Sequence, residues 1–247
     1  MSAASALAKR IIKCFSPPER FQLVIVYGPL GMGKSAYQFK VSVEILKQLY
    51  GMSEEEAWKA VKGLIVWHPE QFFDKLDEAE DMGVKIPVLN WDDAGLWLYA
   101  MDWDDPFIIA FTKWLNVVRT QITCLICSTP SPQFLFKKLR NFPQAITVRV
   151  MKAVSDDKPS HRWLRVAKGY LHYVLPDMKH TRVRLIFKDY FSCKMPDDFF
   201  TWYDPLRKSY AKFAMALMRE KWLSKLKKSE ALKYYRPVAP LPQLIDK

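Results

Sequence analysis

The hydrophobic positions of the chain fall into short continuous runs separated by amphipathic segments. Residues 21–26 (FQLVIV) form an apolar run that is rich in β-branched residues and precedes a glycine-rich stretch, which is typical of a strand buried on both faces. Four later runs of this kind predict further strands, at 64–67, 84–91, 122–128 and 145–150. Strands that alternate with helices predict an α/β fold, a three-layer αβα sandwich with a mostly parallel central sheet.

The segments between these runs carry the spacing and the end signals of helices. Ser53 is a natural N-cap and Glu56 follows three residues later, so the two predict a capping box. Asp105 and Pro106 are likewise suited to begin a helix. The expected helices span 36–50, 53–63, 69–81, 106–119 and 131–141, and a short amphipathic helix is expected near the N-terminus.

Beyond residue 150 the pattern changes. Residues 161–174 and 181–187 partly alternate apolar with basic or aromatic side chains, which predicts an antiparallel β-hairpin. An aromatic loop is expected at 196–205, and a long basic helix from 206 to about 235. We therefore expect three parts: an N-terminal helix (1–19), a core (20–150), and a basic C-terminal extension, hairpin then helix, packed on the core (151–247).

The positive charge of the chain is confined to its C-terminal part. The net charge is +12; residues 1–145 hold 16 Lys/Arg and 16 Asp/Glu, whereas residues 146–247 hold 22 Lys/Arg and 10 Asp/Glu. A basic extension on a neutral core indicates a polyanionic partner, nucleic acid first, and we expect DNA to be bound by residues 151–247. A generally basic surface without such a partner is the alternative.

Membrane and zinc sites are not expected from this sequence. No apolar run reaches the roughly 18 residues of a membrane span, so we expect a cytoplasmic protein, in the host cytoplasm if the chain is viral. Cys124 and Cys127 have C-x-x-C spacing but lie in an expected strand, where an odd spacing sends their side chains to opposite faces. No second pair completes a zinc site, so these are expected to be core cysteines.

Residues 28–35 (GPLGMGKS) match the phosphate-binding loop pattern G-x-x-x-x-G-K-[ST] in full, between an expected strand and an expected helix. The glycines let backbone N–H groups turn toward phosphate oxygens, and the helix N-terminus adds its positive dipole end. Lys34 would place its charge between the β- and γ-phosphates, and Ser35 would offer a hydroxyl to Mg²⁺. The expected nucleotide contacts are Gly28, Pro29, Leu30, Gly31, Met32, Gly33, Lys34, Ser35 and Ala36.

A pair of carboxylates follows the expected strand at 84–91. A nucleotide site of this type needs an acidic partner for Mg²⁺ at the carboxyl end of a neighbouring strand. We expect Asp92 to hold the metal, either through a water molecule or together with Ser35, and Asp93 to orient or deprotonate the attacking water. The alternative is an ordinary turn, because Asp and Gly are common turn residues.

Two further candidates lie beyond the carboxylates. Thr129, with Ser128 as second choice, stands at the tip of the strand at 122–128 and is placed to detect the γ-phosphate. Arg140 lies among the basic residues of the helix at 131–141 and is placed to reach a neighbouring subunit's nucleotide as an arginine finger. A solvated basic helix end, favoured by the helix dipole, is the alternative for Arg140.

Taken in order, the loop 28–35, Asp92–Asp93, Thr129 and Arg140 resemble the motif set of the additional-strand P-loop ATPases, the class with AAA+, RecA-like and HerA/FtsK-like proteins. Over roughly residues 20–150 the chain is similar to small ATPases of archaeal viruses and plasmids, including DnaA-like AAA+ proteins. The resemblance implies a P-loop NTPase fold and Mg²⁺-dependent hydrolysis of ATP, coupled to work on DNA. Asp93 stands where the family has a catalytic Glu, and no helical lid with a sensor arginine is recognisable after residue 150.

Four functions follow as hypotheses. The first is an oligomeric ATPase acting on DNA, of the replication-initiation, helicase-loading or remodelling type. The second is a DNA-packaging or translocating motor of HerA/FtsK type. The third is a small-molecule kinase, and the fourth is a nucleotide-gated binding module with negligible turnover, which the shorter Asp93 keeps open. The order of strands in the sheet separates kinases from additional-strand ATPases.

Overall fold

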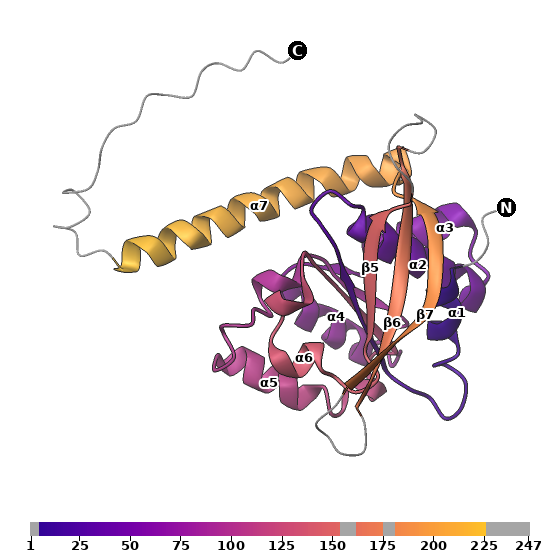
Figure 1. The fold of residues 1–247 in the computed structure, drawn as a ribbon, viewed down its shortest axis with the longest axis horizontal. Coiled ribbons are helices and arrows are strands. Elements are labelled where there is room, and N and C mark those ends of the chain that lie inside the picture. Colours follow the sequence, from indigo (N-terminus) through magenta and orange to yellow (C-terminus); the bar gives the residue numbers. More distant parts are fainter. Residues whose placement is uncertain (1–4, 154–161, 175–180, 226–247) are drawn as a thin grey trace, which may run out of the picture. The chain divides into compact units, whose positions relative to one another are not determined.

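The computed structural model of the chain (Figure 1) describes residues 5–153, 162–174 and 181–225. By its internal contacts the chain forms two units, Met1–Phe200 and Thr201–Lys247. Of the described elements, the first unit contains the whole sheet and every helix before residue 197, and the last helix begins within it. The expected hairpin turn, and the end of the expected C-terminal helix, lie outside the described residues.

The first unit is built on one seven-stranded sheet with the order β2-β3-β4-β1-β5-β6-β7. The strands from β2 to β5 are parallel, and β6 and β7 continue the sheet in antiparallel fashion. The fold is therefore mixed α/β with a mostly parallel sheet, as predicted. The strands are β1 (Gln22–Tyr27), β2 (Ile65–Val66), β3 (Leu89–Trp91), β4 (Cys124–Thr129), β5 (Ile146–Lys152), β6 (Leu164–Val174) and β7 (Thr181–Ser192).

The strand β4 lies inside the sheet rather than at the position that follows from its place in the chain. β4 lies between β1, which leads into the phosphate-binding loop, and β3, which leads into Asp92. The short strand β2 lies outside that pair, at the edge of the sheet.

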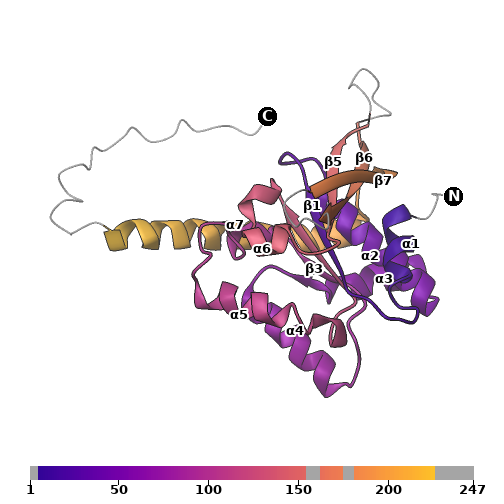
Figure 2. The same cartoon turned by 60° about the horizontal axis from the view of Figure 1, so that its bottom comes forward.

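Alternate side chains of the strands enter two separate hydrophobic cores. Leu23 and Ile25 of β1 pack with α4 and α5, whereas Val24 and Val26 pack with α1 and α2. A strand that is apolar on both faces thus requires helices on both sides, and Figures 1 and 2 show the two groups on opposite sides of the strands. The helices are α1 (Ala6–Ile12), α2 (Lys34–Tyr50), α3 (Glu54–Lys62), α4 (Pro69–Asp81), α5 (Pro106–Trp114) and α6 (Lys137–Arg140).

The two cysteines of β4 follow the same alternation. Cys124 lies in the core beneath α1 and α2, and Cys127 lies in the core beneath α4 and α5. Both are fully buried, which confirms the prediction from their odd spacing. Burial raises the pKa of the Cys127 thiol from 9.0 to about 12.

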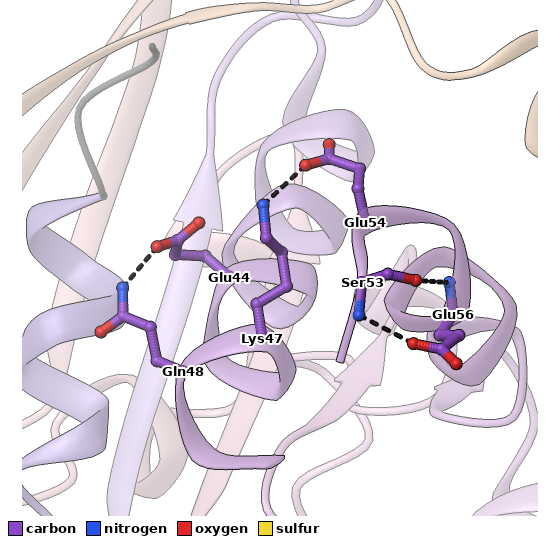
Figure 3. Close-up of polar contacts among 6 residues, drawn as sticks. All are labelled: Glu44, Lys47, Gln48, Ser53, Glu54 and Glu56. Carbon is purple, nitrogen blue, oxygen red and sulfur yellow. Dashed lines mark hydrogen bonds and ion pairs between the residues drawn. The ribbon is translucent and has the colours of Figure 1, made fainter. Parts of the chain in front are cut away.

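Figure 3 shows the corner where α3 follows α2. Ser53 Oγ accepts a hydrogen bond from Glu56 N at 3.3 Å, and Glu56 Oε2 accepts one from Ser53 N at 2.8 Å. The predicted capping box is therefore present. Lys47 of α2 forms an ion pair with Glu54 at 2.7 Å, and its hydrogen bond lowers the pKa of Glu54.

Asp189 of β7 ties the hairpin to α1 and α2. Its carboxylate accepts hydrogen bonds from Ser5 Oγ at 2.6 Å, Ala6 N at 2.8 Å and Tyr37 Oη at 2.8 Å. The first two contacts cap the N-terminus of α1, where a negative charge is favoured. Burial and the adjacent Asp189 raise the pKa of Tyr37.

Several expectations differ from the structure in detail. The strand expected at 84–91 is confined to Leu89–Trp91. The helix expected at 131–141 is interrupted at Leu135, because this buried residue forms an antiparallel bridge with Tyr99. The helix that begins at Pro106 ends at Trp114 rather than at 119. The loop expected at 196–205 is helical from Asp197, in α7 (Asp197–Lys225), with Pro205 inside the helix.

The hairpin is a continuation of the core sheet. The expected boundary at residue 150 falls within β5, which pairs with β1 on one side and with β6 on the other. Among the described residues, no helix is both long and apolar enough to cross a bilayer.

We predict a loss of stability at alkaline pH that depends on Cys127. The folded state holds the thiol proton up to about pH 12, whereas the unfolded state releases it near pH 9. The stabilisation is therefore present below pH 9 and is lost as the pH rises from 9 to 12. Between pH 8 and pH 10.5, the unfolding free energy of the wild type should fall about 2 kcal/mol more than that of Cys127→Ala.

Urea denaturation at both pH values measures this difference. Cys193→Ala serves as the control, because this cysteine is partly exposed outside the sheet. Equal pH dependence in the wild type and Cys127→Ala would contradict the prediction.

Candidate nucleotide-binding site

The phosphate-binding loop connects the end of β1 to the start of α2. Gly28 has φ +152° and Gly33 has φ +85°. A Cβ atom at residue 28 would lie 2.5 Å from Val150 O, and one at residue 33 would lie 2.5 Å from Cys193 Cβ. Glycine is required at both positions because neighbouring strands and loops approach the backbone closely.

The loop surrounds the side chain of Lys34. This lysine is only 7% exposed, and its Nζ donates to Gly28 O at 3.0 Å and to Pro29 O at 3.2 Å. The charge is thus held inside the loop by carbonyl oxygens, which phosphate oxygens could replace. By helix geometry, the first N–H groups of α2 have no intrahelical acceptor, and these include Ser35 and Ala36.

The remaining loop residues form its outer part. Leu30 is 71% exposed at the tip, and Gly31, with φ +75°, has open space around it. Met32 packs partly against the core shared with α1 and α2. Ala36 is buried in the first turn of α2.

Ser35 and Asp92 lie in direct contact. Ser35 Oγ donates to Asp92 Oδ1 at 2.9 Å, although the two residues are 57 positions apart. Asp92 follows β3 and is fully buried, and its backbone N donates to Val66 O of β2 at 2.9 Å. The structure therefore brings together the hydroxyl and the carboxylate that the sequence predicts as metal ligands.

Two more groups donate to the same carboxylate oxygen. Gln38 Nε2 of α2 lies 3.0 Å from Asp92 Oδ1, and Ser128 Oγ of β4 lies 2.6 Å from it. Sequence reasoning missed Gln38. The available signal was helical spacing, because a residue three positions after Ser35 faces the same way along the helix.

Gln38 also supplies a test of whether a hydrated metal ion fits here. Its Oε1 atom is buried and has no hydrogen-bond partner among the described residues. A water molecule, free or bound to a cation, would satisfy this oxygen. Hydroxyl, carboxylate and amide oxygens are the donors that Mg²⁺ prefers, so the residues present fit the predicted ion.

A second buried polar contact lies one turn further along α2. Ser42 Oγ donates to Asn90 Oδ1 at 3.1 Å, and Asn90 Nδ2 lies 2.9 Å from the same hydroxyl. Both residues are fully buried. This contact helps to hold α2 against β3, and so keeps Ser35 in register with Asp92.

Asp93 adopts a left-handed backbone conformation, with φ +50° and ψ +41°. Its N–H donates to Ser128 Oγ at 2.9 Å. Left-handed residues other than glycine cost of the order of 1 kcal/mol and often occur at functional sites. The turn directs the chain away from β3 immediately after Asp92.

At the tip of β4, Ser128 rather than Thr129 contacts the acidic pair. Ser128 Oγ donates to Asp92 and accepts from the backbone of Asp93. Thr129 is fully buried and its Oγ1 donates to Ser131 O at 3.0 Å. The structure thus places the second-choice residue beside the carboxylates and turns the hydroxyl of the first choice toward the following loop.

Arg140 ends α6. Its Nη1 atom lies 3.5 Å from Gln133 O, at the limit of a hydrogen bond. Within the described residues it makes no hydrogen bond to the phosphate-binding loop.

Comparisons with known proteins give one relative by sequence and several distant likenesses by structure. No protein-family model matches the chain. The chain is 30% identical over 118 residues to uncharacterized protein B-251 of Sulfolobus spindle-shape virus 1, a match that covers 45% of this chain and 44% of the viral protein. The matched region thus spans less than half of that relative.

Three solved structures are similar at a low level. The N-terminal domain of zonular occludens toxin from Neisseria meningitidis is 12% identical, with TM-score 0.37, over 74% of this chain and 98% of that one. The flagellar accessory protein FlaH from Methanocaldococcus jannaschii is 14% identical, with TM-score 0.35, over 75% and 98%. A KaiC-like protein from Pyrococcus horikoshii is 12% identical, with TM-score 0.33, over 66% and 89%.

We predict that alanine is tolerated very differently at two glycines of the loop. The Cβ atom that Gly31→Ala adds has open space around it. This substitution should therefore lower the unfolding free energy only by the cost of a left-handed conformation, about 1 kcal/mol. Gly33→Ala adds the contact with Cys193 Cβ and should cost about 2–4 kcal/mol in total. Urea denaturation of the two variants measures both costs, and equal costs would contradict the geometry described above.

Proposed function

We propose that this protein is a Mg²⁺-dependent ATPase that acts on DNA. The observation that carries the proposal is the contact between Ser35 Oγ and Asp92 Oδ1. Ser35 is the last residue of a phosphate-binding loop that matches its pattern in full. A serine at the start of α2 and a buried carboxylate at the end of β3, which is separated from β1 by β4, form a site for a nucleotide-bound cation. The strand β4 between their two strands favours an ATPase over a small-molecule kinase.

Each candidate residue has a defined role in this proposal. Lys34 binds the phosphates, while Ser35 and Asp92 hold the ion, which when bound neutralises charge on the phosphate oxygens. Asp93 orients or deprotonates the attacking water. Ser128 links the tip of β4 to the acidic pair, and Thr129, next to it, detects the γ-phosphate.

The proposal includes a homo-oligomer, in which Arg140 of one subunit reaches the nucleotide bound to a neighbouring subunit. In the described residues its side chain reaches only the carbonyl of Gln133, so it remains available for such a role. DNA is proposed as the partner because the chain's whole net charge lies in residues 146–247. Replication, remodelling and translocation are all compatible with these features.

A nucleotide-gated binding module is the second candidate. Asp93 has a shorter side chain than glutamate and stands in a left-handed turn, so its carboxylate has less reach toward a water beside the γ-phosphate. Such a protein would bind ATP tightly but hydrolyse it very slowly.

We predict that Lys34→Ala and Asp92→Asn each lower Mg²⁺-dependent ATP turnover by about 100-fold or more, because each removes a charge that faces the phosphates or the ion. Lys59→Ala, an exposed lysine on α3, is the control and should leave turnover unchanged. Release of phosphate from ATP measures the effect, with and without EDTA. Turnover that survives both site variants would exclude the proposed site.

Single-turnover hydrolysis decides between the ATPase and the binding module. If Asp93 activates water, Asp93→Ala should slow the chemical step by about 10²–10⁴-fold while ATP binding stays within a few-fold of wild type. If the protein is a binding module, the wild type and Asp93→Ala should show the same negligible rate. Asp93→Glu should then tell whether a longer carboxylate restores hydrolysis.

A further inference from the structure

Three basic residues lie directly opposite one another across the last three strands of the sheet. Arg149 of β5 pairs with Lys168 of β6, and Lys168 pairs with Lys188 of β7. Direct partners on neighbouring strands share one face of a sheet and lie about 5 Å apart. We call Arg149, Lys168 and Lys188 the cation row.

The cation row is on the face opposite α1 and α2. Val148, Val150, Ala167 and Phe187, which alternate with the row along their strands, pack into the core beneath those helices. Because successive side chains point to opposite faces, the row points the other way. Arg149 and Lys188 are exposed there, and Lys168 is half-buried.

Within the part of the chain that the structure describes, the three charges of the row are not paired with a carboxylate. None of the three forms an ion pair with a described residue. In the described part of β5, β6 and β7 the one acidic residue is Asp189, which faces α1 and is bonded to Ser5 and Tyr37. Like charges placed directly opposite each other destabilise a sheet, so the row is suited to a bound polyanion.

Aromatic side chains flank the row on both sides. Tyr170 and Tyr190 each stand two residues beyond a row lysine, and because the strands are antiparallel they lie on opposite sides of the row. Tyr190 is 63% exposed, and Tyr170 is half-buried. Bases stack on such rings only when they are unpaired, whereas a duplex hides its base faces.

We propose that this face binds a single strand of DNA, with phosphates along the cation row and bases stacked on Tyr170 and Tyr190. The inference rests on the proposed function for DNA as the partner, and it adds the strand form and the binding surface.

The same row of side chains leads toward the nucleotide site. Arg149 pairs with Tyr27, the last residue of β1 before the phosphate-binding loop, and Tyr27 pairs with Thr129 of β4. The cation row and Thr129 therefore belong to one line of directly paired residues across the sheet. A DNA strand bound on the cation row lies along that line. This arrangement offers a direct route by which DNA and nucleotide influence each other.

Fluorescence anisotropy with a labelled 20-nucleotide strand and with its duplex tests the proposal on the full chain without nucleotide. The wild type should bind the single strand more tightly than the duplex. Arg149→Gln/Lys188→Gln should weaken single-strand binding at least tenfold and lower the slope of log K against log salt by about 1.4.

The matched control is Arg182→Gln/Arg184→Gln, which removes the same amount of charge, in this case from β7 alone. Arg184 pairs with Leu171 and Arg182 with Tyr173, so both lie on the opposite face. This variant should keep most of the wild-type affinity. An equal loss in both double variants, or tighter binding of the duplex, would overturn the proposal.

A stacking variant separates base contacts from charge. Tyr190→Leu should weaken single-strand binding about fivefold or more without changing the salt slope, and Tyr190→Phe should restore it. Unchanged affinity in Tyr190→Leu would overturn the stacking assignment. Far-UV circular dichroism checks that each variant is folded.

The result is distinguishable from a failure of the proposed function. Basal ATP turnover of Arg149→Gln/Lys188→Gln should equal that of wild type, because neither residue belongs to the nucleotide site. A chain that hydrolyses ATP but prefers duplex DNA would refute this inference alone, whereas one that hydrolyses ATP but binds neither form would also refute DNA as the partner. A chain that binds single strands but lacks turnover would refute the ATPase proposal alone.

Discussion

The structure depends on one buried carboxylate. Asp92 has no exposed surface, so its oxygens must be met by donors from the protein. Those donors come from two different elements, Ser35 and Gln38 on α2 and Ser128 on β4. The same contacts that satisfy the charge therefore hold the loop helix, the acidic strand and the strand between them in one arrangement. Stability and the proposed chemistry share this cluster.

The sheet connects the cluster around Asp92 to the strands of the hairpin at its far edge. β1 is apolar on both faces and needs helices on both sides, but the strands beyond it are apolar mainly on the face that meets α1 and α2. The hairpin is held there by Asp189, which meets Ser5 and Tyr37. The opposite face of the hairpin carries Lys168 and Lys188 beside the aliphatic Val166 and Leu185 and the aromatic Tyr170 and Tyr190. One sheet thus serves a nucleotide site at its centre and an open basic surface at its edge.

Local signals predicted most elements but failed where distant contacts compete with them. Ser53 and Glu56 form the expected capping box because both partners lie within one helical turn. Leu135 breaks an expected helix because it pairs with Tyr99, a residue 36 positions earlier. Pro205 lies inside α7 although a proline usually argues for a loop. Nothing within a short window of sequence reports such pairings.

The sequence by itself determined the phosphate-binding loop, the two-faced burial of β1 and the opposite orientations of Cys124 and Cys127. These depend on residue type and on the periods of helix and strand, which are local properties. Only the tertiary structure decided that Gln38 and Ser128 meet Asp92, and that Arg149 stands in one row with basic residues of β6 and β7. Those relations depend on strand order and register, which are set by the packing of the whole sheet.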